Sequence, residues 1–566
     1  MISDVIGGRG RKSRSLPPVA LICAWAVLLM LPEIIAGPIY VESGGYNLVW
    51  GEQIAALMRQ GEFYPRWLPE SWDGFGSPSF YFYAPLYFLT LGLVSLSGVK
   101  LVAALSITSL FFLGLSGLTM RAWLAGFASP RVALIGALAY MAAPYHLHDI
   151  YARAALAEAS AFAMVPLVAL AMRRVAARQS YGVSLLALGY ALLLLAHLPV
   201  ALLATVILIP AYAGFLLISE DAGRRGLAGR LLIGGVVGLG LSAVFLWPAL
   251  ALQPYISVDK LFGPFFQPQN WLFLTGRFGL FGAELFERTL GGAALAAGCA
   301  VVAVMAWRAA GDRKPVKFWA GYIFICVMLM TGLVPFFWEL PGIRQVQFPW
   351  RIFPLVEFAM ISLLVMTGLQ FPRLVRFFAA QLLAIGMLFY LYMSGALVGQ
   401  AFSNGAQMRA YYVHRKYDAP EYLPPGYPLG VDEYGRPASY MIDLPKMPLA
   451  VIGQGRVLEA RDFPDGAMEV LVTAEAPTEL VARRFFFPHW RLMELERTSA
   501  ATSLTYHRGP QGLVRWQVPE GVHQYRLERG WAPFEQAGLV ISAISCLLLL
   551  LVSRIDRAGK NRILHG

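Results

Sequence analysis

The amino-acid sequence predicts an α-helical integral membrane protein of about twelve spans, with a small β domain on the outer side near the C-terminus. Hydrophobic residues make up 57% of the 566 residues, charged residues only 14%, and the mean hydropathy is +0.57. Soluble domains carry roughly 25% charged residues. Apolar runs long enough to cross a ~30 Å hydrocarbon core as helices recur along the chain. The segment 399–532 instead alternates polar and apolar residues.

The first span is expected at 17–37, directly after a leader that contains Arg9, Arg11, Lys12 and Arg14. This run is too long for the roughly 7–15-residue apolar core of a signal peptide and has no small-residue cleavage pattern, so it is interpreted as a retained anchor. Further spans are expected near 99–122, 131–146, 157–173, 182–196, 199–218, 231–252, 289–308, 317–336, 352–369, 376–398 and 533–553.

Basic residues beside the span ends set the predicted orientation. With the N-terminus in the cytoplasm, the loops "EDAGRRGLAGR", "RAAGDRKPVK" and "FPRLVRF" and the C-terminal "RIDRAGKNR" all fall on the cytoplasmic side, as the positive-inside rule requires. The run 84–98 is either a full span or a juxtamembrane or re-entrant helix. We favour the second interpretation, because the run is short and because it keeps Arg121 and Arg131 inside.

The hydrophilic segment 399–532 is expected to lie outside the membrane and to form the β domain. Runs such as "AMEVLVTAEA" and "LVRWQVPEG" have a period of two and are bounded by Gly and Pro, which indicates a small sandwich. The cysteines, by contrast, fall inside predicted spans, so neither a disulfide framework nor a zinc site is expected; they are Cys23, Cys299, Cys326 and Cys546. The net charge of +12 gathers at span ends, which indicates membrane topology and excludes nucleic acid as a partner.

The segment "YHLHDIYARAALAE", which ends at Glu158, brings several ionisable groups to the outer membrane boundary. One interpretation is an interfacial cap, in which His146 and Arg153 meet lipid head groups and Tyr151 joins the aromatic belt. The other is a functional site, because Glu158 lies inside an apolar run where a charge costs several kcal/mol unless it is paired or hydrated. Arg153 and Glu158 are five residues apart, about 500° on a helix, so Arg153 reaches a shared cavity only from the helix entry.

The outer loop 38–83 combines a predicted helix with an aromatic-rich stretch. "LVWGEQIAALMRQG" has helical apolar spacing that ends at Gly61, typical of an amphipathic helix lying on the membrane. Arg66 then precedes "GFGSPSFYFYAPLY". Aromatic side chains beside an arginine suit either an isoprenoid lipid that carries a phosphate or plain interface packing.

Other outer loops add cations. His197 of "HLP" separates two apolar spans, and Arg351 of "QVQFPWRIFP" stands at the mouth of another. An arginine at a helix end is usually a snorkelling anchor. The alternative is that arginines from separate loops converge on a phosphorylated lipid; the candidates are Arg66, Arg153, Arg344 and Arg351.

An ordered set of motifs then resembles a known family. "GEFYPRWLPESWDGFGSPSFYFYAPLY", "APYHLHDIYARAALAE", "AHLP", "FPWR", "FPHWRLM" and "VPEGVHQYRLERGWAPFEQAGLVIS" together resemble the 6-pyruvoyl-tetrahydropterin synthase-related membrane proteins, which belong with the GT-C-fold glycosyltransferases. The resemblance is spread over nearly the whole chain. It implies a GT-C-like fold and transfer of a sugar from a polyprenyl-phosphate donor to a glycan, lipid or protein acceptor on the outer face of the cytoplasmic membrane.

The resemblance also implies site residues. The spacing "YxRxxxxE" places Tyr151, Arg153 and Glu158 on the family's second-loop motif, and Arg351 and His197 resemble other family positions. Acidic residues of the first two outer loops commonly line GT-C sites, with a divalent metal in some branches, so a divalent metal is allowed for with its ligands unassigned. The first loop departs from the family, because it reads "GGYNLVW" where related proteins usually have an Asp.

In such an enzyme a carboxylate accepts the acceptor's proton while cations stabilise the departing polyprenyl phosphate. We expect Glu158 in the acidic role, with Asp149 and Glu42 as supporting candidates. Glu52 and Asp73 are the other first-loop carboxylates that could replace the missing Asp. The expected phosphate-binding residues are Arg153, Arg66 and Arg351, and Tyr151, His197 and His146 are further substrate-binding candidates.

Two other functions are compatible with many spans and buried charges. A transporter or flippase of lipid-linked sugars often has two related halves with matching broken helices, and the sequence has none that stand out. A catalytically inactive scaffold is favoured by the missing first-loop Asp. Sugar transfer by the purified protein would indicate an enzyme. Movement of the lipid-linked sugar across the membrane without transfer would indicate a transporter, and neither activity would indicate a scaffold.

Overall fold

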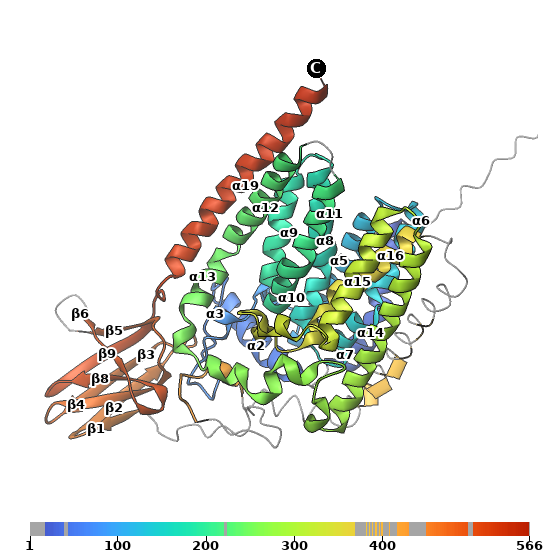
Figure 1. The fold of residues 1–566 in the computed structure, drawn as a ribbon. Helices are drawn as coiled ribbons and strands as arrows, with labels where there is room; N and C mark the ends of the chain where they lie inside the picture. The colour runs from blue at the N-terminus through green and yellow to red at the C-terminus, as the bar shows by residue number, and fades with distance from the viewer. Residues whose placement is uncertain are drawn as a thin grey trace, which may run out of the picture.

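The computed structural model describes residues 17–38, 43–219, 223–367, 416–428, 449–495 and 502–564, together with isolated helical positions between 381 and 407. Most of these residues form a body of packed helices, and the strands form a domain beside one end of it (Figure 1). The predicted combination of a helical membrane protein with a small C-terminal β domain is confirmed.

The helices of the described residues are joined by connections of unequal length. The first are α1 (Pro18–Ala36), α2 (Gly44–Arg59), α3 (Ser79–Phe82), α4 (Leu86–Ser95), α5 (Leu101–Leu124), α6 (Pro130–Met141), α7 (Pro144–Tyr151), α8 (Leu156–Ala176), α9 (Gly182–Ala196) and α10 (Leu198–Leu203). The rest are α11 (Ile209–Ser219), α12 (Arg224–Leu241), α13 (Ala243–Ala251), α14 (Ala283–Ala309), α15 (Lys314–Thr331), α16 (Phe353–Thr367) and α19 (Glu535–Leu564). Short connections join many of the helices, whereas longer segments precede α3, α14 and α16, and the β domain precedes α19.

Eight helical segments among the described residues are long and apolar enough to cross a membrane, or up to nine if the pair α12–α13, bent by 67°, forms one span. The chain is therefore a multi-pass membrane protein. Eight predicted spans coincide with these segments, and the prediction at 231–252 corresponds to the bent pair. The eight segments are Pro18–Ala36, Leu101–Leu124, Leu156–Ala176, Leu198–Ser219, Leu285–Ala309, Lys314–Thr331, Pro349–Thr367 and Glu535–Arg554.

Other predicted spans are shorter than expected. The span expected at 131–146 divides into α6 and α7, because Pro144 lacks the N–H that would continue the first helix. At ~1.5 Å per residue, α6 and α9 measure about 18 and 22 Å, less than the ~30 Å hydrocarbon core. α4 has 10 residues and measures about 15 Å, which is too short to cross the hydrocarbon core. This length is compatible with the predicted juxtamembrane or re-entrant helix at 84–98. The span expected at 376–398 lies almost wholly outside the described residues.

Helix α8 is the centre of the helical body. It packs between α5 and α9, and 89% of its most apolar window is buried. Its sequence "LAEASAFAMVPLVALAMRRVA" is rich in alanine, and small side chains let neighbouring helices approach closely where lipid supplies no hydrophobic drive. This position explains why Glu158, in the first turn of α8, is held inside the protein and not at a lipid-facing surface.

Helix α2 forms where the sequence predicts a helix, but it does not lie on the membrane with one free face. Most of its residues are buried, and it packs against α4 and α5. Its polar residues have partners inside the protein: Asn47 donates to the carbonyl of Ala154 (2.7 Å), and Gln53 donates to Ser71 Oγ (3.1 Å). The amphipathic pattern therefore reflects a polar face that is covered by the outer loop.

The described residues of the β domain form nine strands in two antiparallel sheets. The strand order is β1-β4-β8-β7 in one sheet and β2-β3-β9-β5-β6 in the other. The strands are β1 (Ala450–Ile452), β2 (Gly455–Asp462), β3 (Met468–Ala474), β4 (Thr478–Phe485), β5 (Trp490–Glu494), β6 (Thr502–Leu504), β7 (His507–Arg508), β8 (Leu513–Val518) and β9 (Gly521–Arg529).

The two sheets share one core. Burial alternates along β3, as expected when one face of a sheet is covered. Trp516 of one sheet contacts Tyr525 of the other, with ring centroids 5.8 Å apart and both side chains almost fully buried. This arrangement agrees with the predicted sandwich.

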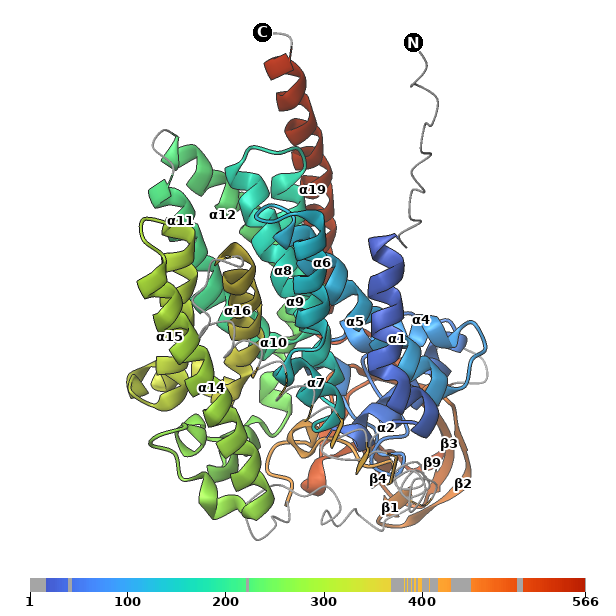
Figure 2. The ribbon, with the colours of Figure 1, turned by 90° about the vertical axis from the view of Figure 1, so that its right-hand side faces the viewer.

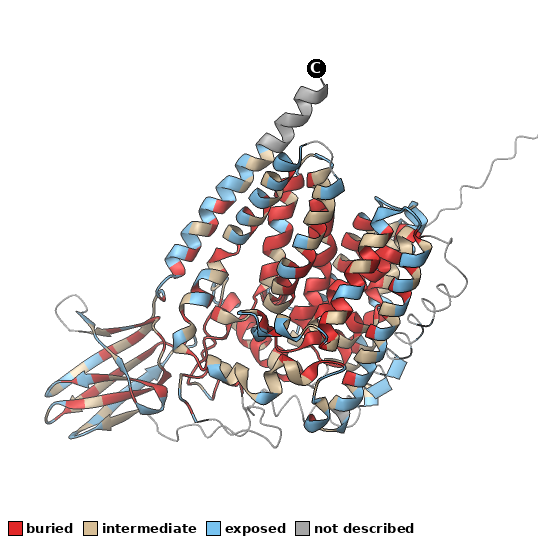
Figure 3. Ribbon diagram, viewed as in Figure 1, coloured by how far each residue is buried: buried red, intermediate tan, exposed pale blue. Residues whose placement is uncertain are grey.

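The β domain and the basic helix ends lie at opposite ends of the molecule. In Figure 2, α1 begins and α19 ends towards the top, while the strands lie at the bottom. The outward sides of α12 and α19 are largely exposed, and the helical interior is buried (Figure 3). Exposed apolar side chains on such long helices suit contact with lipid.

Candidate functional site

The charged segment 145–158 folds as a helix, a break and a second helix. Helix α7 ends at Tyr151, and α8 begins at Leu156. In the break, Ala154 has a φ of +48°, and the N–H of Ala155 donates to the carbonyl of Asp149 (2.8 Å). The chain therefore turns back, so that the side chain of a break residue can reach the first turn of α8.

Glu158 is the centre of the resulting site and is 1% exposed. Its Oε2 atom lies 2.9 Å from Nη1 of Arg153, 3.5 Å from Nε of Arg351 and 4.0 Å from Nε2 of His197. Its Oε1 atom accepts a hydrogen bond of 2.8 Å from the hydroxyl of Tyr145. We call this set, with Asp149, the Glu158 cluster. Residues almost 200 positions apart in the sequence thus meet around one carboxylate.

Asp149 is the second carboxylate of the Glu158 cluster. Its Oδ1 atom accepts a hydrogen bond of 2.6 Å from Nη1 of Arg153, while Oδ2 has no hydrogen-bond partner among the described residues. Complete burial, together with the negative charge of Glu158, raises the pKa of Asp149 well above its usual value. When Asp149 is protonated, two guanidinium groups face one ionised carboxylate, and the cluster is positive.

Local structure holds the two residues that come from other loops. His197 is extended between α9 and α10, and Pro199 lies in the first turn of α10. Burial lowers the pKa of the His197 ring, which is therefore neutral. Arg351 lies in the turn Pro349–Ile352 before α16. Its Nη1 atom donates to the carbonyl of Val346 (2.6 Å) and to Oε1 of Gln347 (3.1 Å), which leaves Nε directed at Glu158.

Glu421 lies beside the segment that carries Tyr83, because the neighbouring Tyr422 stacks on Phe82 with ring centroids 6.0 Å apart. Burial raises the pKa of Tyr83, and the charges of the cluster and of Glu421 also act on its hydroxyl group. Glu421 is partly exposed and has no ion pair among the described residues. Burial, with the neighbouring charge of Asp418, raises the pKa of Glu421 to about 7. The site therefore contains a carboxylate that can exchange a proton near neutral pH.

Other predicted site residues lie elsewhere or have other contacts. Arg66 is paired with Glu535 (3.2 Å) and is separate from the Glu158 cluster. His146 stacks on Phe162, with centroids 4.0 Å apart, and the hydroxyl of Tyr151 donates to a carbonyl of α1 (2.6 Å). Arg344 stacks over Phe262, and Asp73 pairs with Arg483. Glu42 lies outside the described residues.

Two structural carboxylates near the site were missed by the sequence reasoning. Glu357 of α16 accepts the N–H groups of Tyr145 (2.6 Å) and His146 (3.2 Å) at the start of α7. It stands alone in the apolar run "FPLVEFAMISLLVMT", which is the signal that identified Glu158 and would have identified Glu357 as well. By holding the start of α7, Glu357 positions the hydroxyl of Tyr145 for Glu158.

Asp418 is the second missed carboxylate and joins three distant segments. It accepts hydrogen bonds from Nε1 of Trp50 (2.8 Å), Oγ of Ser71 (2.7 Å) and Oγ of Ser79 (2.7 Å). It is fully buried, so these bonds fix the outer loop and the segment that carries Glu421. No local sequence signal marks it, because its partners lie more than 300 residues away.

The Glu158 cluster is better suited to an anion than to a divalent metal. Within the described ranges, no three His, Cys, Asp or Glu side chains are placed to hold a metal ion. The oxygens of Glu158 face Arg153, Arg351 and Tyr145. When Asp149 is protonated, the two guanidinium charges beside one ionised carboxylate repel a further cation. Guanidinium groups are instead well suited to bind phosphate.

Comparison with protein-family models finds no match for the chain, and comparison with curated protein sequences finds none either.

Proposed function

We propose that this multi-pass membrane protein is a glycosyltransferase that moves a sugar from a polyprenyl-phosphate carrier to an acceptor on the outer face of the cytoplasmic membrane. The observation that carries the proposal is the convergence of Arg153 and Arg351 on Glu158. Two arginines held by one buried carboxylate form a preorganised site for a departing phosphate, because they need no rearrangement as negative charge develops.

The helix ends around the cluster add to its preference for an anion. Glu158 lies in the first turn of α8, and Arg351 lies in the turn before α16. The N-terminal end of a helix carries a partial positive charge of about half an elementary charge. The positive N-terminal ends of α8 and α16 therefore lie beside the region where a phosphate is expected to bind.

The distribution of basic residues supports the proposed orientation. Arg173 lies in the last turn of α8, Arg225 in the first turn of α12 and Arg313 directly before α15. These helix ends lie away from the β domain (Figure 2). Cytoplasmic loops are enriched in Lys and Arg. With that end inside, the β domain and the Glu158 cluster are on the outer side, where lipid-linked sugars are used.

We assign separate roles to the carboxylates. Glu158 is already paired with two guanidinium groups, so it is a poor proton acceptor, and its role is to orient Arg153 and Arg351. Glu421, without an ion pair among the described residues, accepts the proton of the acceptor hydroxyl. The hydroxyl oxygen forms a bond to the anomeric carbon while the bond from that carbon to the phosphate oxygen breaks, which inverts the anomeric configuration.

The proposal is tested with the full-length protein in lipid nanodiscs, supplied with polyprenyl-phosphate sugars and an extract of envelope glycans, lipids and proteins. Radiolabel that moves from the carrier to an acceptor, and that is lost in Arg351→Gln, supports the proposal. Movement of the intact carrier across proteoliposomes without transfer identifies a transporter instead. Absence of both activities over the full panel of donors favours a scaffold and overturns the proposal.

A further inference from the structure

A pocket of about 390 Å³ lies where the β domain, the outer loop and the helices α13 and α19 meet. Its wall is largely aromatic and includes Tyr64, Trp67, Tyr81, His489 and Trp531. The volume falls within the roughly 300–1,000 Å³ range of small-molecule sites. We call it the junction pocket; no residue of the Glu158 cluster lines it.

Three of these side chains bring buried polar atoms without protein partners to the junction pocket. The hydroxyl of Tyr64, Nε1 of Trp67 and both ring nitrogens of His489 make no hydrogen bond with the described residues. Trp67 and His489 are each 1% exposed. Buried polar atoms in native proteins are nearly always hydrogen-bonded. All three side chains line the junction pocket, so a polar ligand bound there can supply the missing partners when the side chains turn towards it.

The unpartnered atoms indicate a ligand with both donors and acceptors. Burial, with the nearby charge of Arg529, holds the pKa of His489 well below its usual value, so the ring is neutral and offers one donor and one acceptor. Trp67 can only donate, and Tyr64 can do both. A molecule rich in hydroxyl groups satisfies all of these atoms, because each hydroxyl donates and accepts.

The charges of the junction pocket are already paired within the protein. Arg66 lies 3.2 Å from Glu535, and Arg529 lies 2.5 Å from Glu62. Two neutralised pairs leave little positive potential for a phosphate or a carboxylate. This is the opposite of the Glu158 cluster, where cations outnumber ionised carboxylates when Asp149 is protonated.

We propose that the junction pocket binds a neutral sugar residue of the acceptor, an inference that rests on the proposed function for the identity of the molecule that carries the sugar. Aromatic rings pack against the apolar faces of a sugar, while their polar edges bond its hydroxyl groups. The sugar bound here is one that precedes the reacting hydroxyl and sets the position of the acceptor chain.

Helix α3 connects the junction pocket to the Glu158 cluster. Tyr81 lines the pocket. Tyr83 follows only two residues later, and the charges of Arg351 and Glu158 influence the pKa of its hydroxyl group. Because consecutive Cα atoms are about 3.8 Å apart, the Cα atoms of the two tyrosines are less than about 8 Å apart. The segment from Tyr81 to Tyr83 thus runs from the junction pocket towards the proposed phosphate site.

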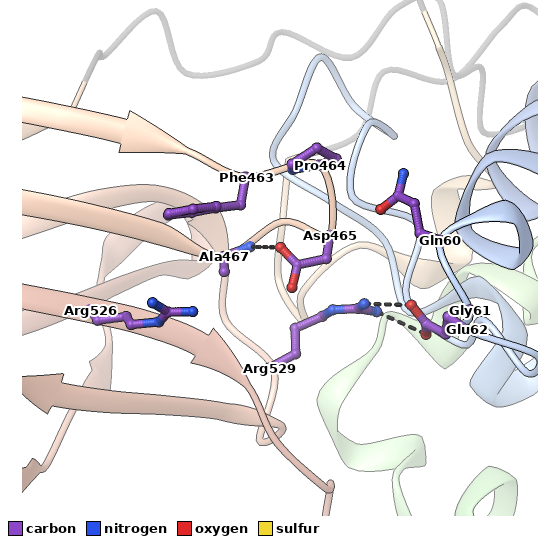
Figure 4. A pocket seen from close by; sticks show the side chains of 9 residues that line it. All are labelled: Gln60, Gly61, Glu62, Phe463, Pro464, Asp465, Ala467, Arg526 and Arg529. Carbon is purple, nitrogen blue, oxygen red and sulfur yellow. Dashed lines mark hydrogen bonds and ion pairs between the residues drawn. The ribbon is translucent and has the colours of Figure 1, made fainter.

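A second pocket, of about 510 Å³, continues from the first on the β-domain side. The two pockets share Glu62 and Arg529, whose ion pair is drawn in Figure 4. Gln60 and Asp465 line the second pocket and supply further polar groups (Figure 4). An acceptor with several sugar units can therefore extend from the junction pocket along the β domain.

The proposal is tested by saturation-transfer NMR on the full-length protein in nanodiscs, with neutral di- and trisaccharides of glucose, mannose, galactose and arabinose as probes. We expect at least one of them to bind the wild type. Tyr64→Phe removes only a hydroxyl, whereas Trp67→Phe removes the indole N–H together with part of the ring, a loss of volume that the control Trp516→Phe reproduces. Each variant should weaken that binding about threefold to tenfold, the scale of one hydrogen bond.

Matched control variants are available in the β-sandwich core. Tyr525→Phe and Trp516→Phe remove the same buried, unpartnered groups, but neither residue lines the junction pocket. Sugar affinity should be unchanged in both controls, and thermal melting should show that all four variants are folded. The proposal is overturned if no probe binds the wild type, if the controls weaken binding equally, or if inorganic phosphate displaces the sugar.

Failure of this proposal can be distinguished from failure of the proposed function. Arg153→Gln alters the Glu158 cluster only, so it should abolish transfer and leave sugar binding at the junction pocket unchanged. Sugar binding without any transfer by the wild type would contradict the glycosyltransferase proposal alone. Transfer that is unaffected by Tyr64→Phe and Trp67→Phe, at sugar concentrations below saturation, would contradict the pocket proposal alone.

Discussion

Oε2 of Glu158 lies 2.9 Å from Nη1 of Arg153, although the two residues are only five positions apart. On an unbroken helix, five residues correspond to about 500° of rotation, which directs the two side chains to different faces. The break between α7 and α8 removes this restriction. The ion pair therefore depends on an interruption of the helix. Glu357 stabilises this interruption, because it binds the N–H groups at the start of α7.

Glu158→Gln is expected to reduce transfer about 100-fold or more, because Arg153 and Arg351 lose the carboxylate that orients them. It should also lower the apparent melting temperature, since two buried cations lose their shared counter-ion. Turnover and thermal melting in nanodiscs measure both effects. Glu33→Gln is the matched control: Glu33 is buried in α1 and bonded to Ser106, away from the site. Normal turnover of Glu158→Gln would exclude the orienting role.

Arg351→Lys keeps the positive charge but loses the planar group that contacts Val346, Gln347 and Glu158 together. We expect the KM for the polyprenyl-phosphate donor to rise about tenfold, which corresponds to about 1.4 kcal/mol. Arg344→Lys serves as the control, because Arg344 of the same outer loop is exposed and stacks over Phe262. An equal rise in both variants would mean that general loop disruption explains the effect.

The dependence of transfer on pH should reflect Glu421. Its carboxylate must be ionised to accept a proton, and burial raises its pKa to about 7, so kcat/KM should increase as the pH rises through about 7. Glu421→Gln should lower the rate and remove this step from the profile. A step near pH 7 that persists in Glu421→Gln would assign the titration to another group.

The same shift has the opposite effect on stability. Between the usual pKa of a glutamate and about 7, the folded protein binds more protons than the unfolded chain, so Glu421 contributes a stability that declines as the pH rises through this interval. Melting temperatures of the wild type and of Glu421→Gln, measured from pH 5 to pH 8, should therefore differ in slope. Parallel curves would contradict the raised pKa.

Asp418→Asn should loosen the outer loop. An amide cannot accept all the hydrogen bonds that Trp50, Ser71 and Ser79 donate, and each lost buried bond costs about 1–3 kcal/mol. We expect a lower melting temperature and faster hydrogen exchange in the peptide that contains 71–83. Asp465→Asn, which affects only a local bond to Ala467, should leave this peptide unchanged. Unaltered exchange in Asp418→Asn would show that the network does not hold the loop.

Much of the architecture follows from local sequence patterns. Long apolar runs mark spans because lipid cannot hydrogen-bond the backbone, and period-two alternation marks strands because one sheet face is covered. Glu158 is identifiable because a charge in an apolar run needs a partner. These signals do not extend to Arg66, whose partner Glu535 follows it by more than 400 residues. The prediction that Arg66 joins the other arginines used chemistry alone and had no information on distance.

The sequence by itself determined that the chain lies in a membrane, that a β domain precedes the last span, and that Glu158 requires cationic partners or water. Only the tertiary structure decided which cations those are. Arg153 reaches Glu158 through a helix break, Arg351 reaches it from the turn before α16, and Arg66 pairs elsewhere. The physical reason is that apolar periodicity follows from a few neighbouring residues. Ion pairs between distant segments instead depend on how all the helices pack.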